Sequence, residues 1–446
     1  MSETESVTGQ SSPERQRQLR LPSGVAFWVV AAVFGLLMFA ASAPSPLYAI
    51  FQARWRFSAT SLTAVFAVYA VVLLVTLLIA GSLSDYVGRR PVIVASLLVE
   101  IAAVLLFLVA GGVGALYAAR ALQGVAVGAA TSALSAALID LQPPDSGRGP
   151  LVNSSAPGLG LALGALATSV LVQYGPAPTH FVWWLLMGTF ALAIPAVLVV
   201  PESVKRRSGA LRSLRPRLGV PRGQAAAFLA HLPALVAVWA LGGFYLSLGP
   251  SLAAATVHSR NLLWGGLVIV LLTGVGSVAA LAFRGWTAAT ALRSGTLLLL
   301  GGSVVTLAGI MLRSGPLLLS GTGVAGIGWG LAFLGVFRSL LALAADAERA
   351  RLVSTIYMVS YLAFSIPALA AGVAVTHAGL HDASLGYGLF VAALSAVATL
   401  LAFVRNPDKR SGDRTLPPIA CSAPMTVDAL PLSTAGQPRP DKLGAT

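Results

Sequence analysis

The residues best placed to do chemistry stand together in the segment GSLSDYVGRRP, residues 81–91, between two long apolar runs. Asp85 and Arg89 are four residues apart, so their side chains share one face if this segment is helical. A carboxylate here can accept from the free N–H groups of a helix N-terminus, and the two arginines can hold a second carboxylate or anionic headgroups. Gly81 and Gly88 permit close helix approach and a tight reversal of the chain.

Glu100 and Arg120 lie inside apolar runs. If these runs cross a membrane, Arg120 should face a cavity and have a partner, because a buried arginine costs roughly 2.5–3.5 kcal/mol on insertion scales. The alternative is that Arg120 snorkels to the membrane surface. A carboxyl in an apolar site takes up a proton more readily than in water, so Glu100 could carry protons, alone or with Arg120. Glu100 could equally serve packing or a dimer contact.

The chain around these residues is too apolar for a soluble protein. Of its 446 residues, 57% are hydrophobic and 10% are charged, whereas a soluble domain is about a quarter charged. Continuous apolar runs of about 18 residues or more can cross a membrane as helices, and a barrel would need short alternating segments instead. The sequence therefore predicts an all-α integral membrane protein with twelve transmembrane helices. The predicted spans are 24–50, 61–80, 92–110, 114–139, 151–173, 181–200, 225–248, 261–283, 295–312, 316–341, 352–376 and 384–404.

The polar segment 202–224 divides the predicted spans into six and six, and it contains seven Lys or Arg and one Glu. We expect an N-terminal six-helix bundle over 24–201 and a C-terminal one over 225–404, joined by this basic linker. Residues 1–23 form an N-terminal tail, and the proline-rich residues 405–446 are expected to be disordered. The linker charges are expected to orient the neighbouring helices, with binding of anionic lipid or a regulatory partner as the alternative.

The formal net charge of +14 could suggest a nucleic-acid partner, but the distribution of the charge argues against one. Most of the 29 Lys and Arg fall in the two tails and in the loops on the side of the tails. This is the positive-inside pattern, which predicts that both termini are cytoplasmic. The richness in Ala, Leu and Arg fits a GC-rich bacterial genome. We therefore expect a multi-pass protein of the bacterial cytoplasmic membrane, surrounded by the lipid bilayer.

The segment between predicted spans two and three resembles the signature loop of the major facilitator superfamily of secondary transporters. The pattern G-x-L-x-D-x-x-G-R-R matches at Gly81, Leu83, Asp85, Gly88, Arg89 and Arg90. The resemblance covers about residues 24–404 and implies a substrate site between two six-helix bundles, with alternating access to the two sides. It also implies that Asp85 latches the bundles near the start of span eleven, and that Arg89 pairs with Asp140. The alternative is that these charges only set the topology.

Span four carries a second resemblance to the same family. Arg120, Gln123 and Gly124 match the family's R-x-x-Q-G element, and Gly128 follows. In the family this arginine is tied to proton coupling or to substrate, so the resemblance implies a coupling or substrate role for Arg120 and Gln123. Gly124 and Gly128 form a small-xxx-small face, which favours close helix packing.

Other segments depart from the family pattern. Antiporter-type members carry G-x-x-x-G-P-x-x-G-G in span five, and here Gly160 and Gly164 match while Ala165 replaces the proline. The glycine pair that should follow is absent. Span one contains no acid, although some drug–proton antiporters of this superfamily place one there. The second-half loop, residues 283–295, contains two arginines but no acid, so any latch is asymmetric.

Aromatic residues are expected to line the cleft between the bundles. The candidates are Tyr48, Tyr69, Trp239, Tyr245, Tyr357 and Tyr361. Some of them, such as Tyr48, could instead belong to the interfacial belts in which Tyr and Trp gather. A cleft with aromatics and few charges favours apolar or weakly charged organic substrates. Pro367 in span eleven is expected to bend its helix where a bundle must open and close.

These features favour a secondary transporter for a small organic molecule, namely a proton-coupled exporter of the drug or metabolite efflux type. The main alternative is a uniporter or a proton-coupled importer of the same fold. A membrane enzyme would need a polar constellation that the spans lack, and a phosphate-cradling motif is absent from the sequence. A non-transporting sensor would not need the latch loop. We expect a monomer with no cofactor and no metal, and the single cysteine, Cys421, offers no thiolate cluster for one.

Overall fold

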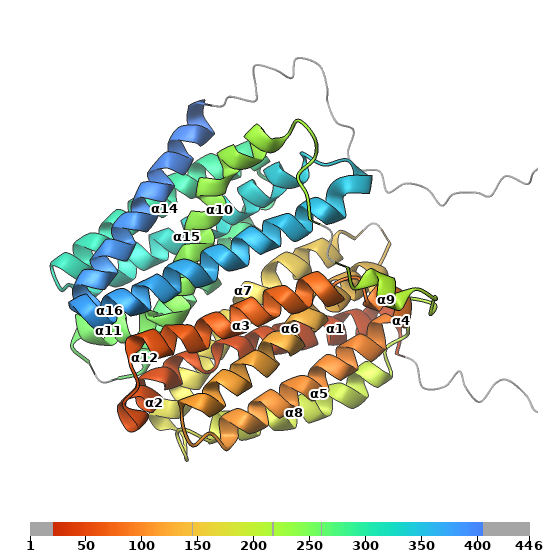
Figure 1. The fold of residues 1–446 in the computed structure, drawn as a ribbon, viewed down its shortest axis with the longest axis horizontal. Helices are drawn as coiled ribbons and strands as arrows, with labels where there is room; N and C mark the ends of the chain where they lie inside the picture. The colour runs from red at the N-terminus through yellow and green to blue at the C-terminus, as the bar shows by residue number, and fades with distance from the viewer. Residues whose placement is uncertain (1–20, 145, 216–217, 260, 405–446) are drawn as a thin grey trace, which may run out of the picture. The chain divides into compact units, whose positions relative to one another are not determined.

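The computed structural model describes residues 21–144, 146–215, 218–259 and 261–404 (Figure 1). Within these ranges the backbone consists of helices and short connections, without a strand. The predicted tails lie outside the described residues, except for residues 21–23 at the start of the first helix. The all-α prediction is therefore confirmed for the described part of the chain.

The first half is a series of long helices with short helical pieces at two of its turns. It comprises α1 (Ser23–Ser42), η2 (Ser45–Leu47), α2 (Tyr48–Trp55), α3 (Ala59–Ala80), α4 (Ser84–Val87), α5 (Arg89–Leu108), α6 (Val113–Leu141), α7 (Arg148–Tyr174) and α8 (Phe181–Leu198). The linker contains one short helix, α9 (Ala210–Ser213).

The second half repeats this pattern. It comprises α10 (Ala225–Ser247), α11 (Gly249–Val257), α12 (Leu263–Ile269), η3 (Val270–Gly274), α13 (Val275–Ala282), α14 (Ala288–Met311), α15 (Gly315–Leu341) and α16 (Asp346–Val404). Helix α14 begins earlier than the predicted span at residue 295, because Thr287 caps it: the Thr287 hydroxyl accepts from the Thr290 N–H at 3.2 Å.

Eleven helices in the described residues are long and apolar enough to cross a membrane. The last of them is two helices, because α16 is interrupted at Gly379, where φ is 83° and ψ is 165°. Glycine adopts this left-handed region without a Cβ clash, so the chain can reverse there. With this division the described chain has the twelve spans and the six-plus-six layout that the sequence predicts.

Glycines let the helices of the first half pack closely. A Cβ on Gly124 would lie 2.7 Å from the Tyr69 carbonyl oxygen, and one on Gly128 would lie 2.6 Å from the Leu73 carbonyl oxygen. Helix α6 therefore lies against α3 at a distance that no larger residue allows. Gly160 has the same role between α7 and α1, where a Cβ would lie 2.6 Å from the Gly35 carbonyl oxygen.

A second glycine of α7, Gly164, approaches the Phe39 carbonyl of α1 in the same way. Beside it, the Ser42 hydroxyl donates to the Leu161 carbonyl oxygen at 2.7 Å. The two glycines that match the family's span-five element are thus packing residues here. Pro367 lies inside α16, and the bend expected there stays a prediction.

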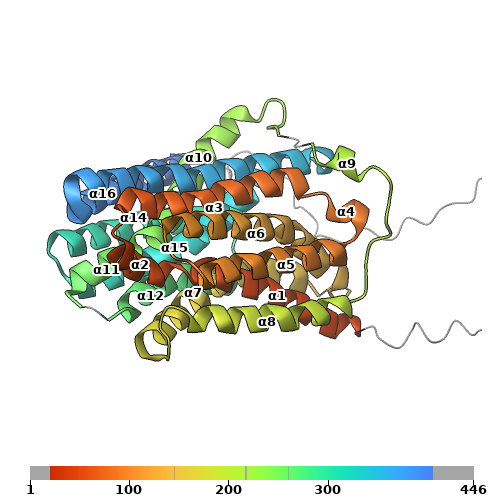
Figure 2. The same cartoon turned by 60° about the horizontal axis from the view of Figure 1, so that its bottom comes forward.

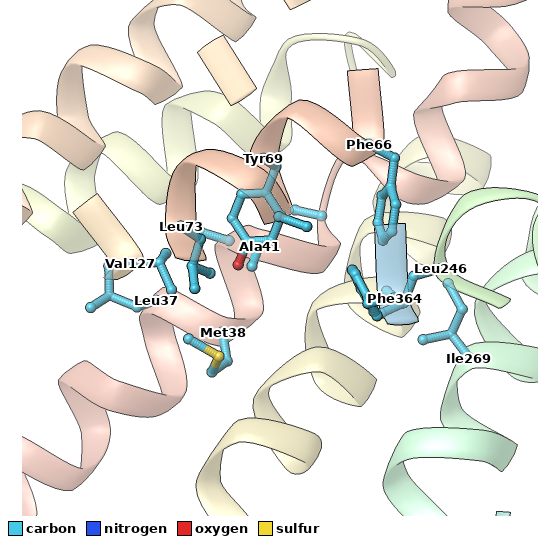
Figure 3. Packing of buried hydrophobic residues seen from close by; sticks show 14 of the residues in the cluster. Leu37, Met38, Ala41, Phe66, Tyr69, Leu73, Val127, Leu246, Ile269 and Phe364 are labelled. Carbon is cyan, nitrogen blue, oxygen red and sulfur yellow. The ribbon is translucent and has the colours of Figure 1, made fainter. Parts of the chain in front are cut away.

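The two halves meet along two helix pairs. Helix α3 packs against α16, as Figures 1 and 2 both show, and α7 packs against α12, η3 and α13. Phe66 of α3 contacts Phe364 of α16 across this boundary, with ring centroids 5.0 Å apart (Figure 3). The same close-up shows Tyr69 and Leu73 of α3 near the side chains of α1. Buried apolar side chains therefore run from one half into the other.

The packing of α6 on α3 gives a first prediction. Gly128→Ala should destabilise the protein by about 1–3 kcal/mol, because the new methyl group overlaps the Leu73 carbonyl and the helices must separate. The measurement is the midpoint of thermal unfolding in detergent, followed by size-exclusion chromatography.

Gly386 of α16 is the matched control, since a Cβ there has nothing within 4 Å. Gly386→Ala should leave the midpoint unchanged or raise it, because alanine favours the helix by roughly 0.5–1 kcal/mol. A midpoint raised equally by both substitutions would show that α6 and α3 are not in tight contact.

Candidate functional site

A cavity of about 1130 Å³ lies between the two halves, at the end of the bundle that carries α4 and the linker. This end is called the linker end here, and the other the far end; Figure 2 shows α9 and α4 together at the linker end. The side chains of Asp85, Arg207 and Arg215 are exposed and line the cavity. The cavity is therefore open to solvent at the linker end.

The first half gives the cavity a polar wall. Thr131, Ser132 and Ser135 come from α6, and Asn153 comes from α7. The hydroxyl oxygen of Ser132 and the Oδ1 atom of Asn153 are buried and have no hydrogen-bond partner among the described residues. Buried polar atoms are costly to leave unpaired. Because both atoms are also closed to solvent in this conformation, the polar groups that this wall presents to the cavity come from its other side chains, such as Ser135.

The second half gives the cavity an aromatic wall. Phe337 of α15 and Tyr357 of α16 line it, with ring centroids 6.4 Å apart. The row continues toward the middle of the bundle through Tyr361, 6.4 Å from Tyr357, and Trp239, 5.1 Å from Tyr361. Phe364 ends the row against Phe66 of the first half. The wall can hold an apolar or aromatic body by stacking.

Contacts between the halves close the far end. The Thr60 hydroxyl of α3 lies 2.8 Å from the Thr376 hydroxyl and 3.2 Å from the Gly372 carbonyl oxygen, both of α16. On the other side of the bundle, Gln173 Oε1 accepts from the Leu262 N–H at 3.0 Å. The cavity is thus accessible from the linker end and sealed from the far end.

The loop 81–88 contains the electrostatic contacts of the linker end. Arg89 Nε lies 3.4 Å from Asp140 Oδ2, so the expected Arg89–Asp140 pair is present. Arg89 also forms an ion pair with Asp85 and donates to the Ser84 hydroxyl at 2.7 Å. Ser203, at the start of the linker, donates to Asp140 at 2.7 Å. Asp85 thus pairs within its own half, and α16 faces it across the cavity. The latch to span eleven stays a prediction.

Glu202, at the start of the linker, contacts this loop and is a residue that the sequence did not single out. Its carboxylate accepts from the N–H groups of Arg89 at 2.8 Å and of Arg90 at 2.9 Å, so it caps the N-terminus of α5. Gly88 precedes the helix with φ at 104°, and a Cβ there would lie 2.8 Å from Glu202 Oε2. The capping carboxylate expected near this helix therefore comes from the linker. In the sequence, the one feature that could have indicated this role is that Glu202 is the single acid of a basic segment.

Glu100, Gln123 and Arg120 form a chain of hydrogen bonds inside the first half, and all three side chains are fully buried. The Gln123 amide donates to Glu100 Oε1 at 2.8 Å, and its carbonyl oxygen accepts from Arg120 Nη1 at 2.5 Å. Arg120 Nε donates to the Tyr48 hydroxyl at 2.5 Å. The snorkelling alternative for Arg120 is thus wrong, because its head group lies in the protein interior.

The break in α1 explains why a buried arginine is tolerated here. Pro44 has no N–H, so the Ala40 carbonyl four residues earlier loses its helical donor. Gln123 replaces that donor, at 3.1 Å, and Arg120 Nη1 donates to the Ala41 carbonyl at 2.8 Å. The break therefore supplies acceptors in the place where the bilayer interior offers none.

The rings of Tyr69, Tyr48 and Phe66 lie 5.0, 5.5 and 5.7 Å from the Arg120 guanidinium carbon. Such contacts stabilise a desolvated cation. Glu100 and Arg120 do not touch each other, because Gln123 lies between them. Glu100 Oε2 has no hydrogen-bond partner among the described residues. One oxygen of this carboxyl is thus free to take a proton without breaking a contact.

The family model of the Major Facilitator Superfamily matches residues 27–366. The chain belongs to the Major Facilitator Superfamily. It is therefore a multi-pass membrane protein of a transporter family rather than of an enzyme family. A comparison of the sequence with curated proteins gives no match.

Two solved transporters of this superfamily have a similar fold. One is the human organic anion transporter MFSD10 (TETRAN), with a TM-score of 0.60 and 18% identity over 85% of this chain and 100% of that one. The other is a bacterial homologue of the human lysosomal transporter Spinster, inward-facing and unoccupied, with a TM-score of 0.66 and 11% identity over 87% of this chain and 98% of that one. At these identities the likeness shows the fold alone.

Of the six aromatics expected in the transporter's cleft, Tyr357 stands among the described residues that line the cavity. Trp239 and Tyr361 continue its row without lining the cavity, and the other three lie elsewhere. Tyr48 and Tyr69 surround Arg120 and do not line the cavity. Tyr245 points into the second half, where its hydroxyl lies 2.7 Å from the Thr322 hydroxyl. Each hydroxyl or ring meets a polar partner of its own half, so the lining prediction does not hold for these three in this conformation.

The cap on α5 gives a second prediction. Glu202→Ala should lower stability by about 1–2 kcal/mol, because two helix N–H groups lose their acceptor. Glu202→Gln keeps one acceptor oxygen and should show about half the loss. The measurement is again the thermal unfolding midpoint in detergent. Asp382→Ala, at an exposed acid of α16, is the control and should show no change. Equal midpoints for all three variants would contradict the cap.

The far-end closure gives a third prediction. Gly372 contacts Thr63, whose Cβ would lie 2.8 Å from a Cβ at position 372. Gly372→Leu should destabilise the closed far end by about 1–3 kcal/mol, which changes the ratio of the two conformations about fivefold or more. The linker end should then close, and a thiol introduced by Ser135→Cys in a Cys421→Ser background should label correspondingly more slowly.

The matched control for this opening is Gly301→Leu on α14, where a Cβ has nothing within 4 Å. It should label at the parent rate. A folded Gly372→Leu protein that also labels at the parent rate would show that these contacts do not hold the far end shut.

Proposed function

We propose that this protein is a secondary transporter that exports a small organic molecule across a bacterial cytoplasmic membrane in exchange for protons. The observation that carries the proposal is the cavity of about 1130 Å³ between the halves, open at the linker end and sealed at the far end. Alternating access requires a site of this kind, because substrate must reach it from one side at a time. The chain is proposed to act as a monomer.

The direction of transport is argued from charge. The linker end carries the basic linker with its seven Lys or Arg, and Lys and Arg gather on the cytoplasmic side of membrane proteins. The open cavity would then face the cytoplasm and load substrate from it. In an importer the same conformation would be the one that releases substrate.

Proton coupling is proposed to act through the chain of Glu100, Gln123 and Arg120. Protonation of Glu100 would remove the negative charge that balances Arg120 through Gln123. It would therefore change how firmly Arg120 and Gln123 hold the broken end of α1. Glu100 does not line the cavity in this conformation, so the proton would enter in another conformation, as exchange requires.

The second candidate is a uniporter or a proton-coupled importer of the same fold. The distance of Glu100 from the cavity favours the uniporter, together with the lack of an acid in α1. For a uniporter, Glu100 would be a structural acceptor for Gln123. Proton movement separates the uniporter from the coupled transporters, and its direction relative to the substrate separates the importer from the exporter.

The test uses purified protein in proteoliposomes that contain a pH-sensitive dye, with a panel of lipophilic amines, benzamide, benzenesulfonate and sugars. At least one compound should move protons in the wild type. Glu100→Gln should reduce this movement about tenfold or more, while counterflow of the same compound down its gradient continues. Retained counterflow separates a lost proton step from a misfolded protein.

Asp382→Asn is the control, because this exposed acid lies on α16 and away from the cavity. It should behave as the wild type. Compounds that cross the wild type without protons would establish the uniporter. Proton movement that survives in Glu100→Gln would remove Glu100 from the mechanism.

A further inference from the structure

The linker is held against both halves across the mouth of the cavity. At one end, the Arg207 N–H donates to the Tyr86 carbonyl oxygen of α4 at 2.9 Å. At the other end, the Gly219 N–H donates to the Thr355 hydroxyl of α16 at 2.9 Å. The linker is therefore anchored on both sides of the opening, at Arg207 and at Gly219.

Two arginines of this segment, Arg207 and Arg215, line the cavity with exposed side chains. Neither guanidinium has an ion-pair or hydrogen-bond partner among the described residues. The one acid among the described lining residues, Asp85, is already paired with Arg89. The described lining therefore has two uncompensated positive charges at its mouth.

We infer that Arg207 and Arg215 form an anion-selecting entrance, and that the transported molecule is a small organic anion with a carboxylate, sulfonate or phosphate group. The inference rests on the proposed function and names its substrate class. Guanidinium groups bind such anions through charge-assisted, often bidentate, hydrogen bonds. Positive charge at the mouth of a cleft also raises the local concentration of anions.

The interior of the cavity fits the rest of such a molecule. The wall of Phe337 and Tyr357 can stack against an apolar or aromatic body. Opposite it, the polar wall of α6, which includes Ser135, can bond its polar substituents. An aromatic anion would thus contact both walls, whereas the sequence alone favoured apolar or weakly charged substrates. The linker arginines make the difference, because only the fold brings them to the cavity.

An anionic lipid headgroup has the same chemistry and could occupy the same arginines. The experiment therefore measures the charge preference of the cavity directly and varies the lipid. The full chain, with Cys421→Ser and Ser135→Cys, is placed in phosphatidylcholine nanodiscs. The introduced thiol is labelled with a sulfonatoethyl or a trimethylammonioethyl methanethiosulfonate, which differ in the sign of their charge.

The anionic reagent should label the introduced thiol faster than the cationic one, by about threefold or more after division by the same rate ratio for free cysteine. The reason is that two nearby positive charges attract the anionic reagent and repel the cationic one. Arg207→Gln with Arg215→Gln should abolish this excess, and each single substitution should remove part of it. High salt should also suppress it. Benzenesulfonate should slow the labelling of the parent more than neutral benzamide does.

Arg206→Gln is the matched control, since Arg206 has the same charge and neighbours Arg207 but does not line the cavity. It should keep the excess. An equal loss of the rate excess in Arg206→Gln, or no loss of it in the double variant, would contradict the proposal that Arg207 and Arg215 form an anion-selecting entrance. An excess that disappears in nanodiscs with phosphatidylglycerol would assign the arginines to lipid and overturn the substrate class.

The labelling does not depend on transport, so it can fail or succeed apart from the proposed function. If the proteoliposomes move protons with benzamide as readily as with benzenesulfonate, transport stands and the anion preference is overturned. If no compound moves protons but the labelling excess is lost when Arg207 and Arg215 are replaced, the anion-selecting entrance is supported and proton-coupled export is rejected.

Discussion

The cost of an unpaired charge inside a membrane is the constraint on which the first half of this protein depends. Arg120 is fully buried, and lipid tails offer no group that can bond its guanidinium. The Pro44 break in α1 exposes the carbonyls that Arg120 and Gln123 bond. The close approach of α6 to α3 at Gly124 brings Tyr69 over the same guanidinium. A helix break, a close helix contact at a glycine and three aromatic rings thus stabilise one buried cation.

Charge arranges the linker end in a similar way. The N-terminus of α5 has free N–H groups, and Glu202 reaches back from the linker to accept two of them. The same linker supplies Ser203 to Asp140, which also pairs with Arg89. The start of the linker is therefore fixed to the first half. Its later part crosses to α16 at Thr355, so the linker connects the halves at the end where the cavity opens.

The sequence predicted what short-range pattern determines. Twelve apolar runs gave the spans, and the loop motif gave the Arg89–Asp140 pair. The contact of Glu100 with Gln123, the cap by Glu202 and the positions of Tyr48 and Tyr245 could not be read from it. In a membrane the lipid-facing side of a helix is as apolar as its buried side, so periodicity does not show which side faces inward. Long-range contacts depend on that rotation.

The proposed coupling requires that protonation of Glu100, through Gln123 and Arg120, shifts the balance between the two access states. It is tested most directly by double electron–electron resonance between spin labels that replace Ile139 and Ala350, which face each other across the cavity. The labels are placed in a Cys421→Ser background at a series of pH values. We expect pH to redistribute long and short distances in the wild type, and Glu100→Gln to show one distribution at every pH. A Glu100→Gln protein that responds to pH as the wild type does would contradict it.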